Sequence, residues 1–95
     1  MKLGELEPRW FAQGEGRHGM GVSFLCPHCR RTRIPVPFAQ PLDGGPPLPG
    51  ATWERTGTTF DDLTLQPSIS FMAVAPDGDN VIEHWHGHVT KGKVA

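Results

Sequence analysis

Alternating side chains are clearest in residues 68–75, SISFMAVA. As a β-strand this segment has one face formed by Ile69, Phe71, Ala73 and Ala75 and another formed by Ser68, Ser70, Met72 and Val74. The four residues that follow, Pro76-Asp77-Gly78-Asp79, have the composition of a tight turn. Residues 80–90 then return as the partner strand, so the pattern predicts a β-hairpin.

Three further strands are predicted from weaker patterns. Residues 20–25, MGVSFL, alternate toward a Cys-Pro-His-Cys turn, and residues 51–56 form a short strand with Trp53 facing inward. Residues 30–38 contain two prolines, which cannot donate to a central ladder, so this segment is an edge strand or a polyproline-like stretch. No convincing amphipathic helix of more than one or two turns is visible. The pattern therefore predicts a small all-β fold.

The chain of 95 residues is long enough for one domain with a thin core. Its twelve glycines and ten prolines interrupt regular structure. We expect residues 1–19, which are polar and rich in glycine, to form a loosely ordered N-terminal arm. Residues 39–50, AQPLDGGPPLPG, have the composition of an exposed loop. The interpretation is a single domain over residues 1–95.

Charge forces no nucleic-acid or membrane partner, since the formal net charge is −1. Its distribution is uneven: residues 1–50 hold six Lys/Arg against four Asp/Glu, or +2, and residues 51–95 hold three against six, or −3. No stretch approaches the roughly 20 apolar residues of a membrane span, and no apolar leader is visible. The two cysteines are separated by only two residues, so a disulfide between them would constrain little of the unfolded chain. A reducing cytoplasm is therefore the simpler expected setting.

Two clusters of metal-ligand residue types lie far apart in the chain, Cys26-Pro27-His28-Cys29 and His84-Trp85-His86-Gly87-His88. Zinc prefers cysteine and histidine ligands, and a Cys-x-x-Cys turn supplies two of them. His84 and His86 lie two apart on one strand face, with Cβ atoms about 7 Å apart, so both imidazoles can reach one ion. We predict Zn²⁺ bound by Cys26, Cys29, His84 and His86, with His88 as an alternative ligand.

The orientation of residues 80–90 decides whether these histidines reach the cysteines. Val81, Trp85 and Val89 form an apolar face that we expect to pack on the core. The opposite face, with the three histidines, would then look toward the cysteine turn, and a one-residue slip in register would exchange the two faces. With a metal closing it, the expected fold is a zinc-ribbon-like antiparallel sheet with long Pro/Gly-rich loops and little helix.

Other interpretations of these residues stay open. A lone Cys-x-x-Cys also fits a redox pair, although Pro27 and the extended segment after Cys29 disfavour the helix start that such a pair needs. The cysteines can equally be free thiols beside solvated histidines. Arg30, Arg31 and Arg33 form a small basic cluster that can meet phosphate, but three arginines in a near-neutral domain are more often a solvated surface.

The segments FLCPHC, then a tryptophan and LQPSIS, then HWHGHVTKGKV, resemble a family of small uncharacterised phage and prophage proteins. Those proteins run Phe-x-Cys-Pro-x-Cys, then Trp, Phe and Pro-Ser-Ile, then a short Trp-His-Gly or Cys-His-Ser segment before a glycine turn. The similarity covers residues 19–94. It implies a phage or prophage context and no particular reaction.

The resemblance also implies residue roles. Cys26, Cys29 and His86 correspond to metal ligands, and residues 67–69 and Gly87 to fold positions. Many relatives have a cysteine just before the Trp-His-Gly histidine. This chain has Glu83-His84-Trp85 there, so His84 would take the place of that ligand.

These observations favour a non-enzymatic zinc-binding module of unknown biological role, with a structural site and no catalytic residues. A closed Cys2His2 shell leaves no position for water. Its expected partner is a protein, with nucleic acid as a further possibility and no membrane, and it would be a monomer or homodimer. Its expected location is the cytoplasm of a bacterial host or a virion. Two alternatives stay open: a virion or assembly component, and a zinc-dependent hydrolase with an open site and a general base among Glu83, His88 and Asp61.

Overall fold

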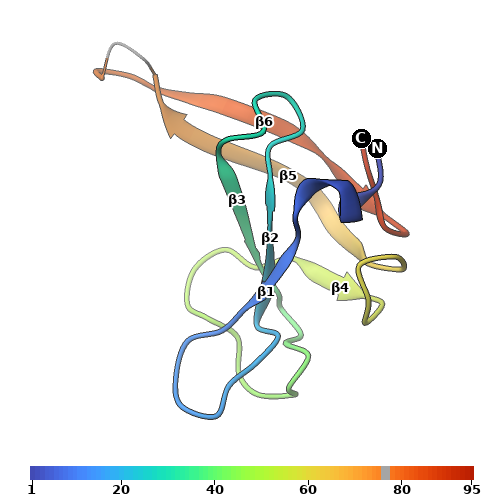
Figure 1. The fold of residues 1–95 in the computed structure, drawn as a ribbon. Coiled ribbons are helices and arrows are strands. Elements are labelled where there is room, and N and C mark those ends of the chain that lie inside the picture. The colour runs from blue at the N-terminus through green and yellow to red at the C-terminus, as the bar shows by residue number, and fades with distance from the viewer. Residues whose placement is uncertain (76–77) are drawn as a thin grey trace.

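Two antiparallel β-sheets form the protein in the computed structural model, which describes residues 1–75 and 78–95 (Figure 1). The first sheet has the order β1–β2–β3, with bounds Arg9–Phe11, Gly21–Leu25 and Arg33–Pro37. The second has the order β4–β5–β6–β7, with bounds Glu54–Thr56, Thr64–Val74, Val81–Thr90 and Lys93–Val94. The small all-β fold is confirmed, while the likeness to a zinc ribbon stays a prediction.

The first sheet follows the predicted pattern closely. Strand β3 lies at the sheet edge and pairs with β2 alone, as its two prolines require. Its alternate residues Ile34 and Val36 are buried, while Pro35 is exposed. Strand β2 is central: Val22 and Phe24 on one face belong to the core, and Ser23 on the other face is buried with its Oγ accepting from the Arg33 guanidinium at 3.0 Å. The Cys-Pro-His-Cys turn therefore directly follows β2 and connects it to β3.

The second sheet is built on the long β5–β6 hairpin, which extends beyond the rest of the molecule (Figure 1). Strand β5 begins at Thr64, four residues before the predicted start, and runs through Pro67. Of the predicted hairpin turn, Pro76 and Asp77 lie outside the described residues. No helix of the described residues is long and apolar enough to cross a bilayer.

A β-bulge interrupts the hairpin at the position that matters most for the site. Phe71 pairs with Trp85, but the next residue, Met72, pairs with Glu83. Two residues of β6, His84 and Trp85, therefore stand where β5 offers one, and an irregularity of this kind re-aims side chains. The predicted assignment of residues 80–90 to two faces is wrong for this reason. Val81 and Glu83, before the bulge, lie on the opposite face from Trp85, after it.

The exposure of the β6 side chains shows which of them face the core on each side of the bulge. Trp85 and Val89 pack in the core as predicted, at 4% and 0% exposure. Val81, which the sequence placed on the same face, is 64% exposed. His84 is half-buried, whereas His86 and His88 are exposed. The bulge separates His84 from the other two histidines.

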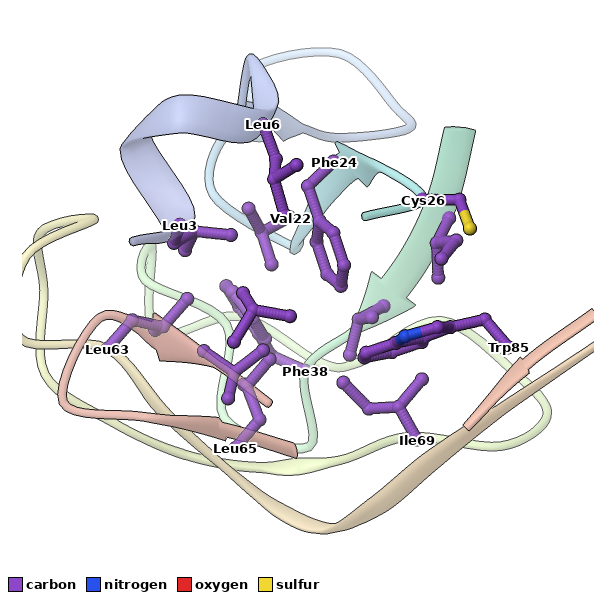
Figure 2. Close-up of a cluster of buried hydrophobic side chains, with 14 residues drawn as sticks. Leu3, Leu6, Val22, Phe24, Cys26, Phe38, Leu63, Leu65, Ile69 and Trp85 are labelled. Carbon is purple, nitrogen blue, oxygen red and sulfur yellow. The ribbon is translucent and has the colours of Figure 1, made fainter. Parts of the chain in front are cut away.

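The hydrophobic core lies between the two sheets (Figure 2). The rings of Phe24 from β2 and Trp85 from β6 meet edge to face with centroids 5.8 Å apart. The other buried side chains of the cluster are Leu3, Leu6, Val22, Cys26, Ile34, Val36, Phe38, Leu63, Leu65, Ile69, Val89 and Val94. Because both sheets contribute, neither face is stable in water without the other.

The N-terminal residues are part of this core, so the prediction of a loose arm over residues 1–19 is wrong for its first half. A 3-10 helix, η1, spans Leu3–Leu6 and buries both leucines. The backbone N–H of Leu3 donates to the carbonyl of Gly92 at 2.7 Å. The ring of Trp10 in β1 stacks on Phe60 at 4.3 Å. Two buried leucines three positions apart are enough to order this segment.

Residues 12–19 and 39–50 contain no strand and are tied to each other. Pro41 is buried and Leu42 packs against the core, so the 39–50 loop is not exposed throughout. The Arg17 guanidinium forms a salt bridge to Asp43 at 2.6 Å. The Asp43 carboxylate also accepts backbone N–H groups from His18 and Gly45. The Arg17 guanidinium and the Gly45 N–H lower the pKa of the Asp43 carboxyl well below its usual range. These contacts fix the end of the molecule far from the hairpin.

Candidate metal centre

The first two ligand residues lie in a tight turn directly after β2. The N–H of Arg30 donates to the carbonyl of Cys26 at 2.9 Å, and the N–H of Cys26 donates to the carbonyl of Thr32 at 2.8 Å. Arg30 has a left-handed backbone, with φ of 55°, which turns the chain back toward β3. Cys26 is buried and Cys29 is exposed, and both are free thiols. The turn thus presents one thiol inward and one at the surface.

The third ligand residue comes from the other sheet. The bulge turns His84 toward the first sheet, and its ring meets Phe71 of the neighbouring strand β5 edge to face with centroids 6.1 Å apart. The Nε2 atom of His84 lies 3.4 Å from the Sγ atom of Cys29. The ligand atoms of Cys26, Cys29 and His84 all lie within 4.8 Å of one another. The structure therefore brings together three of the four predicted ligands.

This donor set fits zinc. Bond lengths of about 2.3 Å to sulfur and about 2.0–2.1 Å to nitrogen place two tetrahedral ligand atoms about 3.5 Å apart. The Sγ–Nε2 distance of 3.4 Å between Cys29 and His84 matches that spacing. Two thiolates and one imidazole are also a combination that favours zinc over the hard, oxygen-seeking cations. Among the described residues, no fourth Cys, His, Asp or Glu joins the group.

The electrostatics of the turn favour the metal-binding form of Cys29. The backbone N–H groups of Arg31 and Thr32, and then the imidazole of His84, lower the pKa of the Cys29 thiol from 9.0 to about 5. A thiolate is the form that binds metal. Hydrogen bonds to a ligand sulfur also hold it in place, as the N–H of Thr32 does at 3.4 Å. Cys29 is consequently a ready ligand at neutral pH.

The lowered pKa predicts an unusual pH profile for alkylation of the metal-free chain under conditions that keep its sheets folded, for example in a stabilising osmolyte. The thiolate of Cys29 is present above about pH 5 and is lost as the pH falls through that value. The rate of its reaction with iodoacetamide should therefore rise through about pH 5 and change little above neutrality. Peptide mapping by mass spectrometry would measure it, with N-acetylcysteine as the control thiol. A rate that rises only near pH 9 in a chain whose circular dichroism still shows intact sheets would contradict the hydrogen-bonded turn.

His86 lies away from the three-residue group. Its Nε2 atom is 2.9 Å from Ser68 Oγ, and its Nδ1 atom is 3.5 Å from a carboxylate oxygen of Glu83. Ser70 donates to the other Glu83 oxygen at 2.6 Å. The His86 and Glu83 side chains remain about half exposed. The cause is the bulge, which leaves His86 on the face of β6 that points away from the cysteine turn.

The remaining predicted residues have other surroundings. His88 lines an open hollow together with Glu54, Gln66, Pro67 and Ser68. Asp61 lines another with Lys2, Lys91, Gly92 and Lys93. None of the three predicted general bases therefore belongs to the ligand group.

The arginine cluster is only partly available for contacts. One nitrogen of the Arg33 guanidinium donates to the carbonyls of Glu7 and Ser23, at 3.0 and 3.2 Å, and to Ser23 Oγ at 3.0 Å. Arg33 thus braces β3 against the N-terminal segment. Arg30 and Arg31 are exposed, and Arg30 reaches the sulfur of Met1. Two exposed arginines make a small surface for phosphate compared with the six or more contacts of typical DNA-binding proteins.

A tight Cys-x-x-Cys turn is expected to offer backbone N–H groups to its thiolates, but the sequence does not indicate which of them hold Cys29. The donors are backbone N–H groups of Arg31 and Thr32, and every non-proline residue carries such a group. Their direction depends on the left-handed backbone at Arg30, which is not a glycine. No residue type in this segment could have signalled them.

Comparisons of this chain with protein-family models, with curated proteins and with solved structures found no match. The phage and prophage resemblance accordingly stays a prediction. The assignment of the candidate site is therefore supported by the geometry of its residues alone.

Proposed function

We propose that this protein is a small zinc-binding module in which Cys26, Cys29 and His84 hold a structural ion, and that it acts through contacts with another protein. The observation that carries the proposal is the convergence of these three ligand atoms within 4.8 Å from two different sheets. The fourth position of a tetrahedral ion would go to water or to an external ligand.

The placement of the ligands supports a structural role. Cys29 and His84 are 55 residues apart in the chain, so an ion that binds both connects the two sheets. A structural zinc contributes about 10–16 kcal/mol of apparent binding free energy at neutral pH. Total stabilities of small domains are about 5–15 kcal/mol. One ion is thus enough to decide whether the two sheets stay together.

The proposal predicts one zinc per chain in protein purified without added metal. Elemental analysis and native mass spectrometry would measure the content, and circular dichroism would follow the fold during chelation. Zinc should leave with a loss of sheet structure, and it should restore that structure when it is added back. A folded, metal-free chain with two free thiols would overturn the proposal.

A zinc-dependent hydrolase is the second candidate, because a shell of three protein ligands is the pattern of catalytic zinc. Two features weigh against it. The Glu83 carboxylate is engaged by Ser70 and His86, and two thiolate ligands make a bound water less acidic than histidines do. A cobalt-substituted protein whose visible spectrum changes on addition of azide, and which hydrolyses an activated ester in a His84-dependent manner, would favour this candidate.

A further inference from the structure

The outer half of the β5–β6 hairpin exposes a set of large apolar side chains. Five large apolar side chains are exposed in the described part of the chain, and four of them lie here: Met72 at 51%, Val74 at 65%, Val81 at 64% and Ile82 at 45%. Met1 is the fifth. Apolar side chains that gather on one surface mark an interaction site more often than those scattered singly.

Three of these side chains form one continuous patch. Val74 pairs directly with Val81 across the two strands, and Met72 lies two positions from Val74 on the same face of β5. Cross-strand partners and next-nearest neighbours on one face are close enough for their side chains to touch. We call Met72, Val74 and Val81 the outer apolar patch. The bulge places Val81 on this face rather than in the core.

The hairpin around the patch also has open edges. Strand β4 pairs with β5 only over residues 54–56 and 64–66, and β7 pairs with β6 only at Val89 and Thr90. In the described chain, no strand flanks residues 69–74 or 81–87 on their outer sides. A strand edge of this kind can accept an extended segment of another chain through main-chain hydrogen bonds.

Charge narrows the choice of partner. The sequence from residue 64 to residue 90 contains three acidic residues, Asp77, Asp79 and Glu83, and neither lysine nor arginine. Glu83 is the cross-strand partner of Met72, at the border of the patch. Negative charge disfavours nucleic acid and the anionic surface of a membrane. It also disfavours a second hairpin of the same kind, which would bring acidic groups together. A cationic protein segment is the complementary occupant.

We propose that the outer apolar patch binds an extended segment of a partner protein in which apolar residues alternate with lysine or arginine. The segment adds a strand to an open edge of the hairpin and sets its apolar side chains beside Met72, Val74 and Val81, on the face that carries the patch. Its cations project from the opposite face, where they complement the negative charge of a hairpin that has neither lysine nor arginine. This inference specifies the partner for the protein-binding role proposed above and rests on that role.

The test uses the zinc-loaded full chain and a defined probe, an acetylated and amidated peptide of four Lys-Val repeats. Titration followed by amide NMR should show shifts confined to residues 69–74 and 81–87. The Val74→Thr/Val81→Thr double variant keeps the β-branched shape but not the apolar surface. It should weaken binding at least about tenfold, because each threonine replaces a methyl group of the docking surface with a hydroxyl. Leu48→Ser, a half-buried apolar residue of the distant 39–50 loop, is the matched control and should bind as the parent does.

Two comparison peptides separate the contributions. Four Glu-Val repeats should not bind, because of charge, and four Lys-Ser repeats should not bind, because of the lost apolar contacts. Equal binding of the Lys-Ser peptide would overturn the apolar docking surface, as would a lack of shifts in the hairpin. Self-association of the parent that the double variant abolishes, measured by sedimentation, would identify a second copy as the occupant and overturn the proposal. Zinc content distinguishes the two proposals: a chain with one zinc but no peptide binding refutes only the docking surface.

Discussion

Alanine in place of His84 is expected to remove the metal and most of the fold. The variant retains only two thiolate ligands, and the ion no longer connects the two sheets. Mutation of groups that merely support a metal ligand costs 10–100-fold in affinity, so loss of a ligand should cost at least about 100-fold. Competition with a chromophoric chelator would measure zinc affinity, and thermal unfolding by circular dichroism would measure the fold.

His86→Ala is the matched control, because it removes an imidazole two positions away on the same strand. Its contacts with Ser68 and Glu83 are exposed, so the variant should lose no more than about 1 kcal/mol of stability and should keep its zinc. Equal loss of zinc in the two variants would show that both histidines bind the ion. That result would support the four-ligand set predicted from sequence and would contradict the placement of His86 by the bulge.

Alanine in place of Trp85 should produce the second large effect, through the core. Trp85 is 4% exposed and meets Phe24 from the other sheet. Truncation of a buried tryptophan costs about 3–5 kcal/mol. In a domain of this size, that corresponds to a fall of at least roughly 12 °C in Tm. Chemical denaturation of the zinc-saturated protein should show this loss of stability while the zinc content of the folded variant stays at the parent's value, because the ring contributes by packing and does not bind the ion.

Trp85→Phe and Trp10→Ala provide the comparisons. The phenylalanine variant retains a ring against Phe24 and should lose less stability than the alanine variant. Trp10 is only half-buried, on the outer side of the core where it stacks on Phe60, so its truncation should also cost less. A Trp85→Ala protein as stable as the parent would be incompatible with the interlocked core of Figure 2.

Strands with strong local signals could be predicted from the sequence. Residues 20–25 and 80–90 correspond closely to β2 and β6, because alternation and flanking turn residues are short-range properties. The edge position of β3 followed from its prolines. The N-terminal segment was missed because Leu3 and Leu6 are isolated in a polar sequence. Their burial depends on the core, which forms only when the two sheets assemble.

The metal ligands show where local reasoning stops. Cys26 and Cys29 needed only their spacing, since a tight turn brings them together in any context. The choice among three histidines required the register of β6 against β5. The bulge changes that register, and the histidine at position 84 gives no sign of it, whereas a glycine there would have suggested a bulge. Regular alternation placed Val81 with Trp85 and grouped His84 with His86. The bulge reversed both assignments, and it created the outer apolar patch in doing so.

The separation of the ligands along the chain has a consequence for the order of events in folding. Cys26 and Cys29 leave the ribosome before His84, which follows Cys29 by 55 residues in the chain. Until then, an ion can be held only by the two thiolates, and the first sheet has no second sheet to cover its apolar face. Closing so long a loop carries an entropic cost that only late contacts offset. Stable binding of the proposed ion therefore has to follow the synthesis of β6, and a chain interrupted before β6 exposes both a reactive thiolate and an uncovered core.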